Sequence, residues 1–367
     1  MAVYYVVFFV LFLCAFLESI NVKYRKKYKN VFLSIFFIIF IILSTIYYGP
    51  GGDLYKYEWY FGVVEFEHLI DPIEPFENGY ILLNALLRIF TSEYWVLRLV
   101  QALIVIGLWK AILLNRKDNF LEGREFIALL CLWALKQGNI LIVRSSIAVV
   151  ICIYGVKYIQ SKEFKKFLMC MLIAFQFHSM VIIFLPAYWL YHKRNLRKKL
   201  YFAIIILVVL SSLLPNMMLS MVGFIPYEYF QMKLLHYIND VGQISYTSYS
   251  YEENLIRALL NMGTSVIILQ IISVITKQNN YEFEGFFNLY LFGTIIYFVT
   301  INVSTALTRA ALPFMDMQML LLPQIFNIPF IKGDARKGFC AFAIFSIYLF
   351  LRMYVNIKDV EYITMFQ

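Results

Sequence analysis

One arginine stands where a helix could present it to a phosphate group. Arg144 opens the apolar segment in NILIVRSSIAVV and is followed by two serines. The start of a helix carries free N–H groups and a partial positive charge, which suit phosphate. An arginine adds a planar fork of donors that grips phosphate oxygens in pairs. The pattern predicts a phosphate ligand at Arg144; an arginine that marks the membrane interface by snorkelling is the alternative.

Two further side chains could share this chemistry. Arg309, in STALTRAALPFMDMQ, stands seven residues before Asp316, hence on nearly the same face of a helix. This spacing predicts either a salt bridge to Asp316 or a second phosphate ligand, because charges inside membranes usually pair. His178, in IAFQFHSMVIIF, suits proton transfer or a hydrogen bond to phosphate. A histidine with a purely structural role fits the same position.

Acids beside phenols form a second kind of candidate site. The stretch IYYGPGGDLYKYEWYF carries Asp53 after a glycine-rich turn, with Tyr57 one helical turn further on. No Lys-Ser/Thr pair follows, so this is not a Walker phosphate loop. Sugar rings bind to aromatic faces and carboxylates, so we predict a sugar site here. An interfacial aromatic belt explains Trp59 but not Asp53. Glu77 and Tyr80, in FENGYILLNALL, form a similar pair.

The composition identifies the kind of protein that must position these side chains. Of 367 residues, 62% are hydrophobic and 15% are charged, whereas soluble domains have about 25% charged residues. The chain is therefore expected to be a membrane protein. Its formal charge of +9 lies in short loops between apolar spans, so we expect no nucleic-acid partner. The five cysteines lie in apolar runs without metal-ligand spacing, which predicts neither disulfides nor a metal site.

The apolar segments predict an all-α, polytopic membrane protein with about 12 transmembrane or re-entrant helices. They fall near residues 3–20, 31–48, 94–114, 125–141, 142–158, 167–190, 200–214, 254–276, 285–303, 306–328 and 338–355. Residues 167–190 have basic loops on both sides but are too short for two full spans. We therefore expect a short hairpin that turns near Gln176 to Ser179. No internal repeat or linker is visible, which predicts one integral-membrane domain over residues 1–367.

Charge predicts which loops share a side. Six connectors hold 21 of the 32 Lys and Arg residues: 21–30, 116–124, 157–166, 192–199, Lys277 and 332–337. Residues 49–78 contain seven acids and only Lys56. The positive-inside rule places the basic set in the cytoplasm and the acidic stretch outside. We expect two longer extracytoplasmic loops, at about 49–93 and 215–253.

Some basic residues do not follow this topology, because they lie within or at the outer ends of the spans. An arginine near the bilayer centre costs about 2.5–3.5 kcal/mol on insertion scales, so it usually faces a cavity or a partner. Seven such residues predict an anion site near the outer face. They are Arg88, Arg98, Lys136, Arg144, Arg257, Arg309 and Arg352.

The order of these features resembles the EpsG-type family, Wzy-like polymerases of bacterial surface polysaccharide. The resemblance rests on YYGPGGDLYKYEWYF, ENGYILLNALL, VRSSIAVVICIYGVKYI, KKFLMCMLIAFQFHSMVIIFLPAYWL and TALTRAALPFMDMQMLLLP, and it covers about residues 31 to 355. The chain departs from the family pattern at IYYGPGGD, because the family more often has an arginine shortly before this turn. Arg88 and Arg98 are the candidates to supply that charge.

The resemblance implies an inner-membrane glycosyltransferase whose active site faces the periplasm. It would transfer a growing glycan from undecaprenyl diphosphate to the non-reducing sugar of a lipid-linked repeat unit, as in O-antigen synthesis, without a cofactor. Its partners would be that lipid-linked oligosaccharide, membrane lipids and a chain-length regulator protein. Arg144 and Arg309 would stabilise the departing diphosphate. Asp53, Glu77 and His178 compete for the role of base.

Other functions remain open at this stage. A flippase or transporter of the lipid-linked sugar would favour internal symmetry and short outer loops, which the sequence does not display. A membrane O-acetyltransferase would need a histidine and acid that reach a cytoplasmic acyl donor, and His192 in a basic run fits poorly. An O-antigen ligase shares the polymerase chemistry with a lipid A acceptor, and the sequence does not separate the two.

Overall fold

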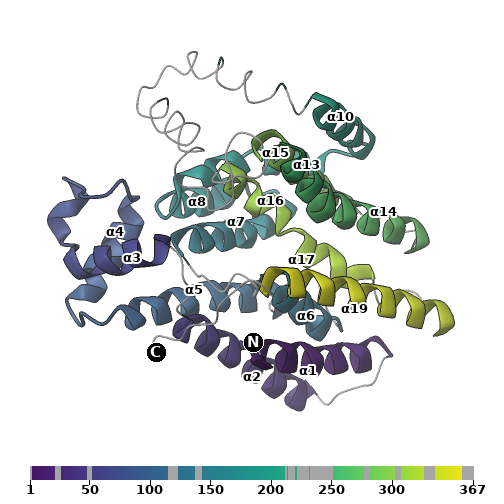
Figure 1. Cartoon of the computed structure of the whole chain (residues 1–367), viewed down its shortest axis with the longest axis horizontal. Helices are drawn as coiled ribbons and strands as arrows, with labels where there is room; N and C mark the ends of the chain where they lie inside the picture. Colours follow the sequence, from purple (N-terminus) through teal and green to yellow (C-terminus); the bar gives the residue numbers. More distant parts are fainter. Residues whose placement is uncertain are drawn as a thin grey trace. The chain divides into compact units, whose positions relative to one another are not determined.

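The computed structural model describes residues 2–20, 26–47, 52–114, 123–136, 143–210, 251–276, 281–301, 307–325 and 335–357, with single positions 213, 220 and 231. In these ranges all regular elements are helical, which confirms the predicted all-α class. Contacts divide the chain into two compact units, and Figure 1 gives the labels of the helices. Unit 1 comprises Met1–Ile182 and Leu322–Gln367, and unit 2 comprises Ile183–Leu321. The single domain predicted over residues 1–367 stays a prediction.

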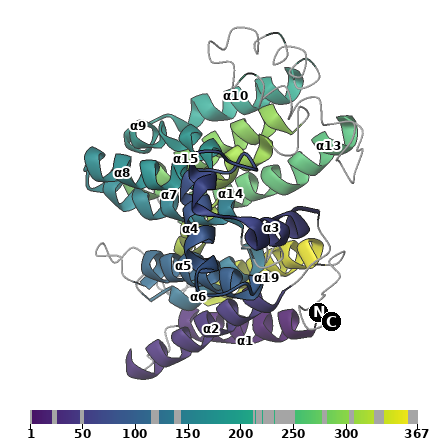
Figure 2. The same ribbon diagram turned by 90° about the vertical axis from the view of Figure 1, so that its left-hand side faces the viewer.

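Unit 1 contains the predicted site residues from Asp53 to His178. Its first part comprises α1 (Ala2–Ser19), α2 (Lys26–Ile46), α3 (Gly52–Val63), η1 (Phe66–Leu69), α4 (Asn78–Arg88) and α5 (Tyr94–Leu114). It continues with α6 (Glu125–Lys136), α7 (Arg144–Gln160), α8 (Phe164–Phe175) and η3 (Ser179–Phe184), whose last two residues belong to unit 2. η7 (Leu322–Ile325) and α19 (Ala335–Ile357) complete it. α1 packs on α6 and α2 on α5 (Figures 1 and 2).

Unit 2 is arranged around one long helix, α15 (Tyr281–Thr300). α9 (Ala187–His192), α10 (Arg197–Leu210) and α16 (Leu312–Met315) pack against it. The unit also contains α13 (Tyr251–Ala258), the π-helical turn η5 (Leu259–Gly263), α14 (Thr264–Thr276), η6 (Leu307–Ala311) and α17 (Gln318–Leu321). Most of the predicted outer loop 215–253 lies outside the described residues.

Five helices in the described ranges are long and apolar enough to cross a membrane: Ala2–Ser19, Tyr28–Ile46, Tyr94–Leu113, Tyr281–Thr300 and Gly338–Val355. α1 illustrates why. One face buries Phe8 and Leu11, while the other exposes Val6 (60%), Phe9 (53%) and Leu13 (57%). A helix that is apolar on both its packed and its exposed face fits a lipid environment. The chain is thus an all-helical membrane protein, and about twelve spans stay a prediction.

Two predicted spans are interrupted. α8 ends at Phe175 and the 3₁₀-helix η3 begins at Ser179, so regular helix stops where the turn was predicted, at Gln176 to Ser179. The hairpin itself stays a prediction. The span predicted at 306–328 is not one regular helix over its described residues. Residues 307–325 alternate between 3₁₀ and α turns, because Pro313 and Pro323 cannot donate the main-chain hydrogen bonds of a regular helix. The pairing of Arg309 with Asp316 stays a prediction.

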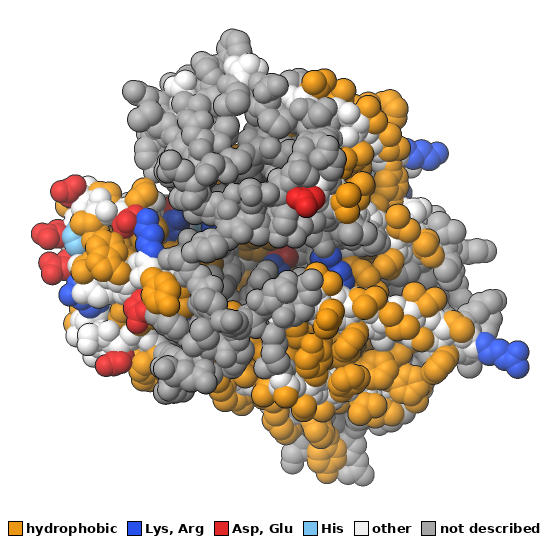
Figure 3. Space-filling model, viewed as in Figure 1, with side chains coloured by type: hydrophobic (Ala, Val, Ile, Leu, Met, Phe, Trp, Pro, Cys, Tyr) orange, Lys and Arg blue, Asp and Glu red, His pale blue; other side chains and the backbone are white. Residues whose placement is uncertain are grey.

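α5 runs between the two ends of unit 1. This helix has 21 residues, which corresponds to about 30 Å. Tyr94 at its start packs against the aromatic residues of α3 and α4, and its other end leads toward the start of α6. Acidic side chains gather over the α3–α4 end (Figure 3). The ion pairs of Lys29 with Glu18 and Glu125 lie where α1 ends and α2 and α6 begin. The separation of acidic and basic connectors, and which end faces outward, stay predictions.

Candidate functional site

Arg144 and His178 come together because α7 and α8 form a tight antiparallel pair. The two helices are separated by residues 161–163, where Lys162 adopts the left-handed conformation (φ 58°) that a sharp turn requires. They then pack along each other. The first residue of α7, Arg144, and the residues that follow α8 are thereby brought to the same end. The predicted helix start at Arg144 is confirmed.

The loop after α8 is joined to α4 by a close contact at a glycine. A Cβ atom built on Gly79 would lie 2.7 Å from Cβ and 2.8 Å from the carbonyl oxygen of Gln176. The main-chain N–H of Tyr80 donates to that same carbonyl oxygen at 3.2 Å. Only glycine allows this approach. Sequence reasoning placed Gln176 at a turn but missed Gly79 and this contact; the signal for Gly79 was the glycine within ENGY.

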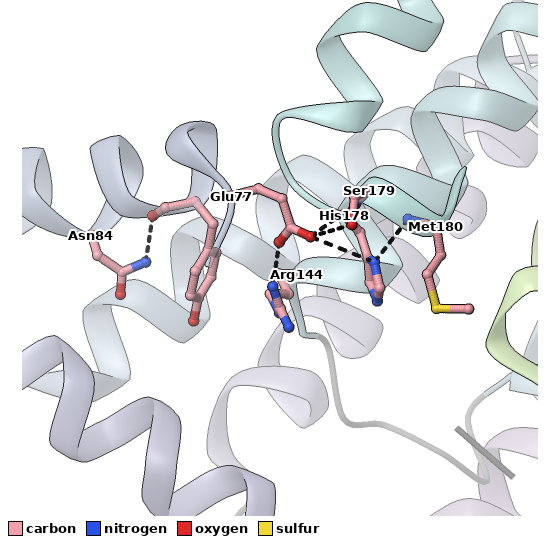
Figure 4. Close-up of polar contacts among 7 residues, drawn as sticks. Glu77, Asn84, Arg144, His178, Ser179 and Met180 are labelled. Atoms are coloured by element: carbon pink, nitrogen blue, oxygen red, sulfur yellow. Dashed lines mark hydrogen bonds and ion pairs between the residues drawn. The ribbon is translucent and has the colours of Figure 1, made fainter. Parts of the chain in front are cut away.

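Glu77, just before α4, accepts hydrogen bonds from two other segments (Figure 4). Its Oε1 accepts the main-chain N–H and the hydroxyl of Ser179, both at 2.9 Å. Its Oε2 accepts from Nη1 of Arg144, with which it forms a salt bridge. The carboxylate therefore connects the starts of α4, α7 and η3. Sequence reasoning named Glu77 and Arg144 but missed Ser179.

The guanidinium of Arg144 is fixed on two sides. Its central carbon lies 4.5 Å from the centroid of the Phe76 ring, within cation–π range, while Nη1 bonds Glu77. The Arg144 side chain is 13% exposed and that of Glu77 is 10% exposed. The cation is thus largely removed from water but still reachable, which strengthens its interaction with any anion that enters.

His178 lies beside this pair. Its Nδ1 is 3.9 Å from Oε1 of Glu77, beyond hydrogen-bond range. The same Nδ1 accepts the main-chain N–H of Met180 at 3.4 Å. This contact assigns the proton of the neutral imidazole to Nε2.

The predicted sugar-binding tyrosines are buried. Tyr57 is 7% and Tyr80 1% exposed, and they pack with Tyr60 and Phe76 in one cluster beneath Arg144. Burial, together with the charge of Glu74, raises the pKa of Tyr60 to about 12, and burial raises the pKa of Tyr80 well above its usual value. Both phenols stay neutral. Neither Tyr57 nor Tyr80 offers an open ring face to a sugar, so the structure gives them a packing role.

Two predicted anion ligands bind main-chain carbonyl groups instead. Arg98, 2% exposed, donates through Nη2 to the carbonyl of Ser44 at 2.7 Å, near the end of α2. Arg88 donates through Nη1 to the carbonyl of Val64 at 2.6 Å, just after α3. Carbonyl groups at helix ends carry partial negative charge and lack partners within the helix. These contacts anchor α2 and α3 to the helices that carry the arginines.

Two predicted residues are not joined to this cluster by the described contacts. Asp53 is the second residue of α3, and its side chain and most of the preceding turn lie outside the described residues. Arg309 lies in η6 of unit 2. Among the described residues, no three His, Cys, Asp or Glu side chains gather to hold a metal ion.

The fold and the site define an integral-membrane protein with a charged cluster at one end of a helical unit. The sequence matches the family model described as the EpsG family over residues 29–366. The chain belongs to the EpsG family, which confirms the resemblance seen in its motifs. Membership indicates a membrane protein of polysaccharide biosynthesis. No curated protein and no solved structure gives a significant match.

Proposed function

We propose that this protein is a glycosyltransferase that polymerises a surface polysaccharide. It transfers a growing glycan from undecaprenyl diphosphate to the non-reducing end of the next lipid-linked repeat unit, at the periplasmic face of the inner membrane. Family membership supports the biosynthetic role. The observation that carries the reaction type is the cluster of Glu77, Arg144, His178 and Ser179, where a cation and a neutral imidazole meet at one end of unit 1.

In the proposed reaction the bond between the anomeric carbon and the diphosphate oxygen breaks, and the diphosphate leaves with the bonding electrons. The acceptor hydroxyl forms the new bond to the anomeric carbon and gives its proton to a base. Charge grows on the diphosphate, so fixed donors near it lower the barrier. A guanidinium has five N–H donors, more than one carboxylate can use. Arg144 can therefore serve Glu77 and a phosphate oxygen together.

The contacts of the cluster favour Asp53 as the base. Glu77 accepts three hydrogen bonds, and taking up a proton would disrupt them. Neutral His178 carries its proton on Nε2 and can donate to a phosphate or sugar oxygen. Glu77 then positions Arg144, and His178 assists the leaving group. Arg309 remains our second diphosphate ligand.

This assignment predicts a severe loss of polymer for Asp53→Asn, which keeps the size and hydrogen bonding of the side chain but removes its charge. Glu67→Gln is the matched control, because Glu67 is an exposed acid of the same predicted loop. The measurement is the ladder of surface polysaccharide on a gel, at equal membrane levels of each protein. Normal chains with Asp53→Asn would move the base to Glu77 or His178.

The function itself is tested by deletion of the gene. We expect single repeat units on lipid A and no ladder, and we expect the intact gene to restore the ladder. Complete absence of repeat units would instead identify a ligase or a flippase. Complementation with His178→Ala should leave the ladder strongly reduced, whereas Lys162→Ala, at the far end of α7, should restore it fully.

A further inference from the structure

A basic loop of unit 2 contains none of the residues named in the proposed reaction. Residues 193–199 comprise the connection from α9 to α10 and the first turn of α10; we call them the basic loop. They contain five cations: Lys193, Arg194, Arg197, Lys198 and Lys199. All except the partly buried Arg197 are exposed. Basic residues in such a loop follow from membrane topology alone. Membrane topology does not explain the contacts that hold this loop in one conformation.

α15 fixes the conformation of the loop through side chains of its first turns. Asn195 adopts a left-handed conformation (φ 58°), and its main-chain N–H donates to Oε1 of Glu284 at 3.0 Å. Nδ2 of Asn288 donates to the carbonyl of Lys193 at 2.7 Å. The ring nitrogen Nδ1 of His192 is hydrogen-bonded to the hydroxyl of Tyr281. The loop is therefore ordered before any ligand binds, which lowers the entropic cost of binding.

Two arginines of the loop are placed on aromatic rings of the same helix. The guanidinium carbon of Arg194 lies 5.4 Å from the centroid of Tyr281, and that of Arg197 lies 4.8 Å from the centroid of Phe287. Within the described part of the chain, none of the five cations forms an ion pair. A guanidinium stacked on a ring retains its planar fork of N–H donors, which matches phosphate oxygens.

The neighbouring surface is apolar. Trp189 in α9 is 53% exposed and Phe202 in α10 is 65% exposed, on either side of the loop in sequence. α15, against which both helices pack, begins at Tyr281 and is one of the candidate membrane spans (Figure 2). Exposed tryptophan beside clustered Lys and Arg is typical of the boundary between lipid tails and headgroups.

We infer that residues 193–199 bind the phosphate groups of anionic phospholipids. Arg194 and Arg197 grip the phosphates, the lysines add attraction, and acyl chains cover Trp189 and Phe202. A phospholipid satisfies both the cationic and the apolar part of this surface, whereas a soluble anion satisfies only the first. The inference does not depend on the proposed polymerase reaction.

The test uses the full-length protein in nanodiscs of phosphatidylcholine with increasing phosphatidylglycerol. The readout is binding of a fluorescent phosphatidylglycerol, with the thermal unfolding midpoint as a second measure. Surface cations each contribute appreciably to anionic-lipid affinity, so we expect Arg194→Gln/Arg197→Gln to weaken binding about tenfold or more. Arg194→Lys/Arg197→Lys should lose part of the affinity, because the charge stays but the fork and the ring contact change.

The matched control is Lys162→Gln/Lys165→Gln, which removes the same charge from another predicted cytoplasmic loop with two exposed lysines. It should bind lipid like the unaltered protein. Equal weakening in the control would mean a general charge effect and overturn the inference. Equal stabilisation by inorganic phosphate in pure phosphatidylcholine discs would assign the loop to a soluble anion instead, and also overturn it. If the Gln pair does not fold, the Lys pair decides by the same comparison.

Discussion

Two charged clusters in unit 1 lie at the two ends of α5. Both combine carboxylates with a basic side chain, but the surroundings of the cation differ. In the first, Glu18 at the end of α1 accepts the main-chain N–H groups of Phe126 and Ile127 through Oε2, at 2.9 and 3.1 Å. Lys29 lies between Glu18 and Glu125, at 2.8 and 2.6 Å. In the second, Glu77 accepts the N–H of Ser179 and bonds Arg144. Each cluster thus has a carboxylate that binds the start of a helix from another segment.

The difference lies in the cation. The ammonium of Lys29 is shared by two carboxylates, so its charge is already balanced. Arg144 faces the carboxylate of Glu77 with one edge and lies on the Phe76 ring, and a neutral histidine is adjacent. An incoming anion would meet two carboxylates at the first cluster, whereas at the second it would meet a guanidinium with one carboxylate and a histidine.

The comparison teaches that burial and salt bridges alone do not identify the site. Both clusters are largely buried, and both join helices distant in sequence. What separates them is the type of cation and the nearby irregular backbone. The first cluster joins the ends of three regular helices, whereas the second includes the break between α8 and η3. The following predictions test this division between a structural cluster and a functional one.

The largest effect is expected for Arg144→Ala, which should abolish long polysaccharide chains. Arg144→Lys should restore little, because a point charge cannot replace the planar fork. Removing one partner of a buried pair leaves the other charge uncompensated, at a cost of about 3 kcal/mol. Chain length is read from a gel, and stability from thermal unfolding of the purified protein in detergent.

The double change Arg144→Ala/Glu77→Gln separates the two effects of losing Arg144. It removes the uncompensated carboxylate, so stability should recover while long chains remain absent. If the double variant makes normal chains, Arg144 serves only to neutralise Glu77 and the comparison with Lys29 fails.

A large effect is also expected for Gly79→Ala. The new methyl group would meet Cβ and the main-chain oxygen of Gln176 below 3 Å. A main-chain atom cannot move aside as the end of a long side chain can, so α4 must shift away. We expect about 1–3 kcal/mol of destabilisation and shorter chains. Gly62→Ala in α3 is the control, because a Cβ there meets nothing within 4 Å. Equal behaviour of the two variants would contradict a role for the contact.

Several parts of this site were predictable because they depend on local rules. The segment 167–190 has basic loops on both sides but is too short for two full spans, which predicted an interruption near His178. Serines after Arg144 and the apolar run beyond them predicted the start of α7. Both arguments use only helix length and helix ends, which are properties of neighbouring residues.

Other features depend on contacts that no local pattern encodes. Tyr55 and Tyr57 look alike in the sequence, yet Tyr55 is 60% exposed and Tyr57 is 7% exposed. The packing of α3 against α4 decides which phenol is buried. The approach of Gly79 to Gln176 joins segments almost a hundred residues apart. Tertiary packing therefore buries Tyr57 and Tyr80, which the sequence pattern did not predict.

At the opposite end of α5, Glu18→Gln should lower stability without changing the polysaccharide. The amide still offers one acceptor to the N–H groups of Phe126 and Ile127, but the charge that faces Lys29 is lost. Weakened charge-assisted bonds predict about 1–3 kcal/mol of destabilisation. The unfolding midpoint should fall, while chain length at equal protein level stays normal. Loss of long chains would mean that the first cluster also takes part in function.

The smallest effect is expected for Tyr57→Phe, which tests whether the aromatic cluster supports the site or contacts sugar. The change removes one hydroxyl but keeps the ring packed on Phe76 and Tyr80, whose centroids lie 5.7 and 5.9 Å away. Chain length and stability should both stay near normal. Tyr57→Ala should instead cost about 3–5 kcal/mol through the cavity it leaves, and polymer should fall only in proportion to folded protein. Loss of polymer in Tyr57→Phe at a normal protein level would mean that the hydroxyl meets the substrate, and that this buried cluster opens during the reaction.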